Sequence, residues 1–329
     1  MMEIRIPENG VIKEQTINIE KEVSIIYGYN NSGKTSFLRV LNEVMYNNLL
    51  TQFILEQKSE MSVYIPTNRL VVSDAQTKLE RMKDLEEFIY YQQESYKNYS
   101  LHLKLIRDYL LSNAVILRFI CDTIQRIFGI HIENIDGRYS DGIENIINIY
   151  LCIIWTMVWD IDVQKLDTES FQLVLKEKNI CILIDEIEMF LHVNIQEKLV
   201  RSLKEDFTNC SFWLTTHSPL ILTRYKNVVV YEIEYGKLQR IDENLYYQDL
   251  NNIYEGFFSV QELPIDIRED INYLGRVNMK RVRGEGVLDR VHIIAEKMKK
   301  EYPNLYIKYN HIISKAKCGG ENDKDKTGK

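Results

Sequence analysis

Short apolar blocks near the start of the chain predict three strands, over residues 3–6, 15–19 and 23–27. The third block, VSIIY, is apolar and rich in β-branched residues, as in a strand that is buried on both faces. It leads directly into Gly28, and apolar residues then recur with helical spacing from Ser36 to Leu49. This pattern predicts a strand, a glycine loop and a helix in succession.

The following part of the chain has helical periodicity. Residues 78–97 are strongly charged and residues 101–128 are apolar at helical spacing, so we expect a helical insertion over residues 75–135. The apolar run Ile146–Trp159 is shorter than the roughly 20 residues that a transmembrane helix needs. It therefore predicts a buried helix, over residues 143–158.

Strands and helices alternate in the next part of the chain. We expect strands over residues 180–184 and 210–214 with a helix over 193–204 between them, then a hairpin of strands 228–233 and 238–241. Such alternation is typical of an α/β fold with a mixed or parallel sheet flanked by helices. Residues 242–315 indicate a mainly helical C-terminal region, and the polar residues 316–329 indicate a disordered tail.

Charge and cysteine usage narrow the class of protein. A net charge of −7 argues against indiscriminate binding to nucleic acid. The basic stretch from Arg276 to Arg290 leaves contact with a nucleic-acid backbone open, beside a solvated face or a protein-docking surface. The five scattered cysteines form no Cys-x-x-Cys pair and the N-terminus has no apolar leader, so we expect a cytoplasmic protein with reduced thiols and no membrane segment.

The glycine loop carries the first chemical motif, because Gly28–Thr35 fits the pattern G-x-x-x-x-G-K-[ST]. Its glycines let the backbone wrap around phosphates, and the helix that follows presents its N-terminus to the anion. We expect Lys34 to reach the β- and γ-phosphates of ATP and the Thr35 hydroxyl to bind Mg²⁺. The residues expected to contact the nucleotide are Gly28, Asn30, Asn31, Ser32, Gly33, Lys34, Thr35 and Ser36.

Polar residues also follow two later strands. Asp185 and Glu186 come after strand 180–184, and we expect Asp185 to hold Mg²⁺, directly or through water, and Glu186 to act as general base. The alternative is a strand that ends in two solvated acids. The segment Thr215-Thr216-His217-Ser218-Pro219 follows the next strand, and we expect a neutral His217 imidazole to contact the γ-phosphate. The alternative for His217 is an ordinary polar contact at a strand end.

These three motifs, in this order, resemble the ABC-like ATPases of the overcoming-lysogenization-defect type. This is the AAA-15/AAA-21 group, which is related to SMC and double-strand-break-repair ATPases. The resemblance rests on Gly28–Thr35, on the run from Ile184 to His192 and on Thr216–Pro219, and it covers roughly residues 1–240. It implies an ABC-like ATPase domain over residues 1–241 that binds ATP and Mg²⁺ and hydrolyses ATP.

The resemblance also directs attention to Tyr139-Ser140-Asp141-Gly142, which precedes the predicted buried helix. In the family, a Ser-x-Gly signature contacts the nucleotide that the partner protomer holds. The resemblance therefore implies a head-to-tail homodimer, or a higher oligomer, in which Ser140 and Gly142 complete the partner's site. The alternative is that Ser140 is a helix N-cap and Gly142 lies in a turn. The transporter string Leu-Ser-Gly-Gly-Gln is absent, which argues against a transporter subunit.

Two further segments are less specific. A strand over residues 62–65 and the polar turn after it lie where the family has a glutamine loop, and Asn68 or Arg69 would replace the glutamine unless the segment is a surface turn. Glu188, His192 and Gln196 are expected at the start of the helix that follows the acids. We interpret His192 as structural or at the dimer seam, because no second His or Cys has metal-ligand spacing.

The resemblance implies a nucleotide-dependent dimeric switch, the sensor or regulator subunit of an anti-phage defence system that controls a separate effector. Residues 242–329 are short and mainly helical, so we expect no nuclease in this chain. The alternative is an SMC-like or repair-like ATPase that clamps nucleic acid with the basic stretch and the helical insertion.

Overall fold

The computed structural model describes residues 2–19, 23–54, 61–67, 99–135, 139–241, 245–246, 248, 253, 265–278 and 286–316. The chain divides into two compact units, Met1–Ile253 and Tyr254–Lys329. In the first unit a six-stranded sheet has the order β4 (Met61–Ile65), β5 (Ile180–Ile184), β6 (Ser211–Thr215), β3 (Val23–Tyr27), β7 (Val228–Glu234) and β8 (Lys237–Ile241).

The central strands of this sheet are parallel, and only the β7–β8 pair is antiparallel. Ile65 lies opposite Ile184, Ile184 opposite Leu214, and Ile26 opposite Thr215. The carboxyl ends of β3, β4, β5 and β6 are therefore level with one another. The polar residues that follow these strands meet at one edge of the sheet, which is where α/β folds place their ligands.

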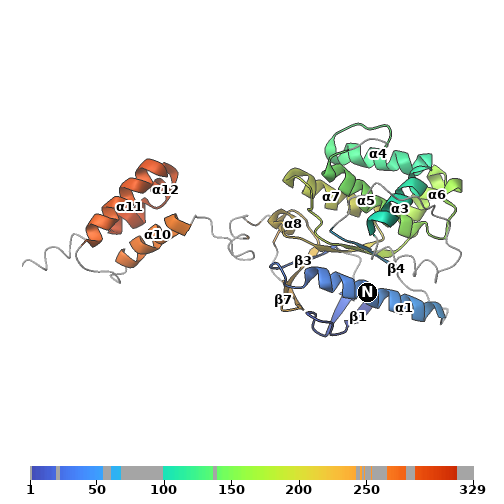
Figure 1. Ribbon diagram of the computed structural model, residues 1–329, viewed down its shortest axis with the longest axis horizontal. Helices are drawn as coiled ribbons and strands as arrows, with labels where there is room; N and C mark the ends of the chain where they lie inside the picture. The colour runs from blue at the N-terminus through green and yellow to red at the C-terminus, as the bar shows by residue number, and fades with distance from the viewer. Residues whose placement is uncertain are drawn as a thin grey trace, which may run out of the picture. The chain divides into compact units, whose positions relative to one another are not determined.

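Helices cover both faces of the sheet (Figure 1). The helix α1 (Lys34–Ile54) and the antiparallel pair β1 (Met2–Ile6) and β2 (Gln15–Ile19) lie on one face. There Phe37 of α1 packs on Trp213 with ring centroids 5.9 Å apart, and Trp213 stacks on Tyr231. The other face is covered by α3 (Tyr99–Leu111), α4 (Ala114–Phe128), α5 (Asp141–Met157), α6 (Thr168–Glu177) and α7 (Val193–Asp206).

The helix α5 is the core of this second layer. All of its residues from Asn145 to Met157 are buried, as expected for a helix that is apolar on every side. It is the buried helix that the run Ile146–Trp159 predicts. Across the described residues, no helix combines the length and the apolar character that crossing a membrane requires.

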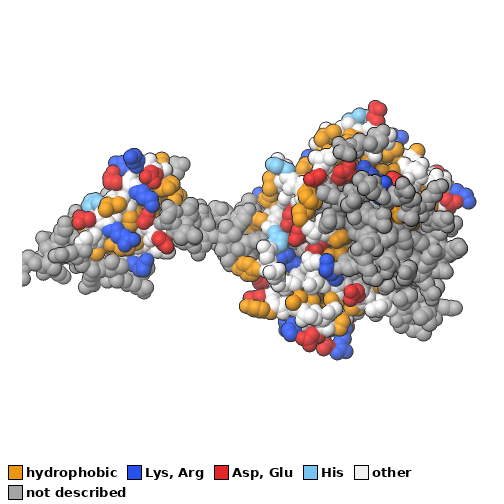
Figure 2. All heavy atoms as spheres, viewed as in Figure 1, with side chains coloured by type: hydrophobic (Ala, Val, Ile, Leu, Met, Phe, Trp, Pro, Cys, Tyr) orange, Lys and Arg blue, Asp and Glu red, His pale blue; other side chains and the backbone are white. Residues whose placement is uncertain are grey.

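The second unit has a small core of its own. Its helices α10 (Ile265–Asn278), α11 (Val287–Glu301) and α12 (Pro303–Lys308) pack through residues that include Leu274, Val291 and Ile294. The Arg290 guanidinium lies 4.2 Å from the centre of the Tyr273 ring, which gives this arginine a packing role. On the face seen in Figure 2, the described residues of this unit show both signs of charge interspersed.

The predicted elements agree with the observed ones, with a few shifts. Strands 15–19, 23–27 and 180–184 have the predicted bounds, whereas β6 begins one residue later than predicted and α1 extends to Ile54. Within the range of the predicted helical insertion, the structure has the helices α3 and α4, and residues 78–97 lie outside the described part. The tail was predicted to start at residue 316, but residues 311–316 are helical and Ala316 is buried.

Candidate functional site

The glycine loop joins β3 to α1 and depends on backbone that only glycine fits. A Cβ atom on Gly28 would lie 2.7 Å from the Ile233 carbonyl oxygen of the neighbouring strand. Gly33 has a φ of +108° and Asn31 a φ of +63°, so the loop turns through left-handed conformations before α1 begins. Asn30 and Asn31 are exposed, and Ser32 and Ser36 are partly exposed. The side chains of Asn30, Asn31 and Ser36 are accessible to a ligand at the helix N-terminus, whereas the Ser32 hydroxyl oxygen is buried.

The lysine of the loop is buried, with only 6% of its surface exposed. Its Nζ atom donates hydrogen bonds to the carbonyl oxygens of Gly28 (2.8 Å) and Tyr29 (3.0 Å). Burial lowers the pKa of Lys34, and the negative charges of Glu186, Asp185 and Glu188 oppose that shift. The ammonium group is therefore held at the centre of the loop, under the influence of three carboxylates.

Asp185 is the buried acid of this sheet edge, with 1% exposure. Its Oδ2 atom accepts hydrogen bonds from the Thr35 hydroxyl (2.8 Å) and the Thr67 hydroxyl (3.0 Å). Its Oδ1 atom accepts one from the Thr215 hydroxyl at 2.7 Å. One carboxylate thus joins the start of α1 with the ends of β4 and β6.

Glu186 follows at the same edge and is partly exposed. Its φ of +47° is unusual for a residue other than glycine, and its N–H donates to the Thr215 hydroxyl at 2.7 Å. The next residue, Ile187, donates its N–H to the Thr215 carbonyl oxygen at 3.1 Å. The backbone of the acidic turn is therefore attached to the end of β6.

His217 is half-buried just beyond β6. Its pKa is lowered mainly by burial and then by the charge of Lys34, against the opposing charges of Glu188 and Asp185. The imidazole is therefore favoured in its neutral form next to the loop lysine. Its backbone N–H donates to Glu188 Oε1, and the Thr216 hydroxyl donates to Glu188 Oε2 at 2.8 Å.

The Ser-x-Gly segment lies at the start of α5. Ser140 is exposed and occupies the N-cap position, but its side chain makes no capping hydrogen bond. A Cβ atom on Gly142 would lie 2.8 Å from the Phe190 carbonyl oxygen, and Asn145 Nδ2 donates to the Met189 carbonyl oxygen at 2.7 Å. The start of α5 is therefore packed against the loop that follows the two acids.

The structure brings together most of the residues that the sequence singles out. Lys34, Thr35, Asp185, Glu186 and His217 gather at one sheet edge, through hydrogen bonds or through mutual electrostatic influence. Ser140 is exposed and no described contact joins it to them. Asn68 and Arg69 lie outside the described residues.

Sequence reasoning missed two threonines and misplaced one acid. Thr67 and Thr215 both bind Asp185, and the available signal is that each is a hydroxyl residue at the carboxyl end of a parallel strand. Glu188 lies in the loop before α7, because α7 begins at Val193 with His192 as its N-cap. The prediction that Glu188 lies on that helix is wrong.

One family profile matches this chain around the acids. The family profile described as "AAA domain, putative AbiEii toxin, Type IV TA system" matches residues 174–223. The chain is also 50% identical over 42 residues to the "Retron Vc95 probable ATPase" of Vibrio cholerae serotype O1 biovar El Tor. That alignment spans 13% of this chain and 8% of the retron protein.

Two solved structures show a distant likeness in fold. One is cbiO1 from Clostridium perfringens, part of the ABC transporter complex cbiONQ, with 15% identity, a TM-score of 0.38 and coverage of 83% of this chain and 92% of that one. The other is an SmcHead bound to the C-winged helix domain of ScpA, with 10% identity, a TM-score of 0.39 and coverage of 71% and 94%.

The matched segment 174–223 contains Asp185, Glu186 and His217, and the glycine loop meets them at the carboxyl edge of a parallel sheet. The motifs that follow one another along the chain therefore also lie together in the fold. The first unit is therefore an α/β domain with a P-loop at the carboxyl edge of its sheet, and its residues 174–223 are similar to the AAA family whose profile they match.

Proposed function

We propose that this chain binds ATP with Mg²⁺, hydrolyses the ATP, and uses the cycle as a dimeric switch. The observation that carries the proposal is the contact between Thr35 at the start of α1 and Asp185 at the end of β5, beside the buried Lys34. In P-loop NTPases a lysine, a hydroxyl residue and an acid in this arrangement hold the phosphates and their metal.

The oxygens of this site suit a magnesium ion. Two oxygens bound side by side to Mg²⁺ are about 3 Å apart, since each lies roughly 2.1 Å from the ion. Thr35 Oγ1 and Asp185 Oδ2 are 2.8 Å apart, and both are the hard oxygen donors that Mg²⁺ prefers. These two residues would hold the ion, which when bound neutralises charge on the phosphate oxygens.

The protein's own groups then have separate roles in the reaction. Lys34 donates hydrogen bonds to the phosphates and offsets their charge, and the loop N–H groups orient them. Glu186 accepts the proton of the attacking water as general base. A neutral His217 contacts the γ-phosphate, and because this contact ends with hydrolysis, it distinguishes ATP from ADP.

The dimer assigns a role to the exposed start of α5. Ser140 has a hydroxyl that no capping bond occupies, at the N-terminus of a 17-residue helix, where an anion is stabilised. In a head-to-tail dimer, Ser140 and Gly142 of one protomer would contact the γ-phosphate held by its partner. ATP then favours the closed dimer and hydrolysis releases it.

The similarity to a retron ATPase and to a toxin-associated AAA domain supports a role in defence against phage, with this chain as sensor or regulator and a separate protein as effector. We expect no nuclease activity from this chain alone. Copurification of a second protein from the native host would identify the effector. Metal-dependent cleavage of DNA or RNA by the pure chain would contradict this assignment.

ATP turnover and nucleotide binding test the catalytic roles. Lys34→Ala should abolish nucleotide binding. Glu186→Gln should keep binding but lower kcat by about 10²–10⁴-fold, the usual contribution of a general base. Glu197→Gln is the matched control, because this acid lies on the surface of α7 in an ion pair with Arg201. A Glu186→Gln variant that hydrolyses ATP at the normal rate would remove Glu186 from this role.

Association measured by light scattering tests the switch. The Glu186→Gln chain should form a dimer with ATP and Mg²⁺ but not with ADP. Adding Ser140→Arg should block that dimer while the monomer still binds nucleotide, because the bulky cation occupies the helix start. Ser314→Arg, at an exposed position of the second unit, is the control. An ATP-driven dimer that tolerates Ser140→Arg would exclude Ser140 from the interface.

A further inference from the structure

The site contains one acid that the proposed hydrolysis does not use. Glu188 lies two residues beyond the general base, in the loop between β5 and α7. Its two carboxylate oxygens are engaged separately: Oε2 accepts from the Thr216 hydroxyl and Oε1 accepts from the His217 N–H. Both donors belong to the segment after β6, 28 and 29 residues further along the chain.

This bridge spans the two side chains that act on the reacting atoms. Glu186 comes from the end of β5 and His217 from the end of β6, so their separation depends on what joins those two strand ends. The bonds of Asp185, Glu186 and Ile187 to Thr215 already join the two strand ends, and Glu188 extends this join from Thr215 to the histidine. The Glu188 carbonyl oxygen accepts the Leu191 N–H at 2.9 Å. The loop is tightly turned here, since the Glu186 carbonyl oxygen also accepts the Met189 N–H at 3.0 Å.

Other contacts already secure the neighbouring residue of the segment. Thr216 is fully buried, its N–H donates to the Ile26 carbonyl oxygen at 3.1 Å, and its hydroxyl accepts the Ser218 N–H at 2.9 Å. The Glu188 carboxylate adds a charge-assisted bond to the His217 backbone. The conformation of His217 therefore depends directly on Glu188, whereas the fold of the segment is also held by the other bonds of Thr216.

We propose that Glu188 is a positioning residue for ATP hydrolysis, which holds His217 at a fixed distance from Glu186 and from the phosphate site. It does not contact the reacting atoms. The proposal rests on the ATPase activity proposed above. A displacement of about 1 Å in a positioned group costs on the order of 10²-fold in rate, so the loss of this bridge should reduce turnover while leaving the phosphate loop intact.

Steady-state ATP turnover of Glu188→Ala is the main test. We expect kcat to fall about 10²-fold, while the affinity for a fluorescent ATP analogue with Mg²⁺ stays within about twofold, because Lys34 and Thr35 are unchanged. Glu188→Gln keeps one acceptor oxygen and the same length, so its kcat should fall by only about tenfold. If Glu188→Ala does not fold, the Gln variant carries the test.

A double variant separates positioning from general support of the fold. If Glu188 acts through the histidine, then Glu188→Ala combined with His217→Ala should turn over ATP within about twofold of His217→Ala alone. A purely structural role would instead multiply the two losses. Ser218→Ala is the matched control, because it removes the Ser218–Gln196 hydrogen bond of the same segment and should lower the unfolding midpoint without changing kcat.

The outcomes separate the two proposals. Wild-type chain that fails to hydrolyse ATP, alone and with its partners, would overturn the proposed function and this inference together. Wild-type chain that hydrolyses ATP, with Glu188→Ala at the same kcat, would overturn this inference only. Multiplicative losses in the double variant would also overturn it.

Discussion

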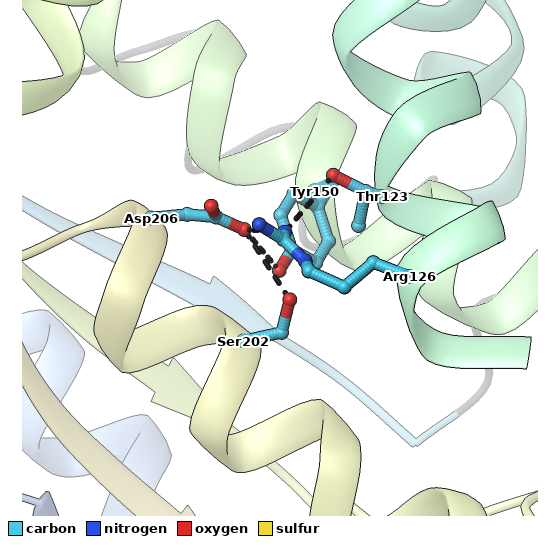
Figure 3. A network of polar contacts seen from close by, with 5 residues as sticks. All are labelled: Thr123, Arg126, Tyr150, Ser202 and Asp206. Atoms are coloured by element: carbon cyan, nitrogen blue, oxygen red, sulfur yellow. Dashed lines mark hydrogen bonds and ion pairs between the residues drawn. The ribbon is translucent and has the colours of Figure 1, made fainter.

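Asp185 is buried and Asp206 is partly exposed, and these two aspartates of the first unit are engaged in different ways. Asp185 accepts hydrogen bonds from the hydroxyls of Thr35, Thr67 and Thr215 at the edge of the sheet. Asp206, the last residue of α7, accepts from the Arg126 guanidinium, from the Tyr150 hydroxyl (2.8 Å) and from the Ser202 hydroxyl (3.4 Å). Figure 3 shows this second network, in which Arg126 also donates to Thr123.

The partners explain the difference in role. An aspartate at a helix C-terminus faces the negative end of the dipole, and the Arg126 charge compensates for that position. Tyr150 is fully buried, so its hydroxyl needs an acceptor, and Asp206 provides one while linking α4, α5 and α7. Asp206 therefore serves the structure, whereas the hydroxyls around Asp185 can be replaced by a cation without leaving an arginine unmatched.

The comparison is tested most strongly by Asp185→Asn. We expect ATP turnover to fall by at least about 10³-fold, because metal binding supplies several kcal/mol of transition-state stabilisation. The unfolding midpoint should hold or rise, since an amide keeps an acceptor oxygen and removes a buried charge. Turnover with a range of Mg²⁺ concentrations and thermal unfolding measure the two effects. An Asp185→Asn chain that hydrolyses ATP at the normal rate would contradict the difference in role between Asp185 and Asp206.

The reverse outcome is expected for Asp206→Asn. The free energy of unfolding should fall by about 1.5–3 kcal/mol, because hydrogen bonds to a charged acceptor are lost around Arg126 and Tyr150. Turnover per folded molecule should stay the same. Urea unfolding measures the loss, with Glu197→Gln on the same helix as a control worth only about 0.3–0.5 kcal/mol. If turnover collapses without a loss of stability, Asp206 belongs to the chemistry.

The close packing of α5 on the acidic loop predicts a smaller effect. Gly142→Ala should lower the free energy of unfolding by about 1 kcal/mol, because the new Cβ would lie 2.8 Å from the Phe190 carbonyl oxygen. Gly275→Ala, in a helix with no atom within 4 Å of its Cβ position, should instead stabilise its own unit by about 0.5–1 kcal/mol. If both substitutions raise the free energy of unfolding by the same amount, α5 does not depend on this contact.

The smallest effect concerns pH. Because burial and the Lys34 charge lower the pKa of His217, its imidazole stays neutral as the pH falls through 6.5, and turnover should decline only below that value. In the same window an unfolded histidine takes up a proton that the folded one does not, so stability is full above 6.5 and falls as the pH drops. A pH profile of kcat with a midpoint above 6.5 that disappears in His217→Gln would contradict the lowered pKa of His217.

Most of the sheet and most of the site could be read from the sequence. Buried parallel strands are apolar without interruption, so VSIIY and the run before Asp185 have unambiguous patterns, and each motif follows such a strand. What remained hidden depends on contacts between distant segments. The roles of Thr67 and Thr215 arise only when β4, β5 and β6 lie side by side, and local periodicity does not predict that strand order.

The loop after the acids shows a second limit. Helical spacing suggests that Glu188 begins a helix, but tight turns with positive φ at Glu186 and Phe190 delay α7 until Val193. These turns are imposed by bonds to Thr215, Thr216 and His217, which are tertiary. The role of Glu188 can therefore be inferred only once the structure shows that these turns replace the expected helix.

The hydrogen bonds of Lys34 have a thermodynamic consequence. Its ammonium already donates to two carbonyl oxygens of its own loop, so a phosphate gains those donors by exchange and not by adding to an unbonded group. Such exchanges are worth only about 0.5–3 kcal/mol each, the upper part applying to charged acceptors. The loop therefore keeps its shape at little cost before the nucleotide arrives. In the dimer proposed above, the energy of binding would then be left for closing two protomers around the nucleotide.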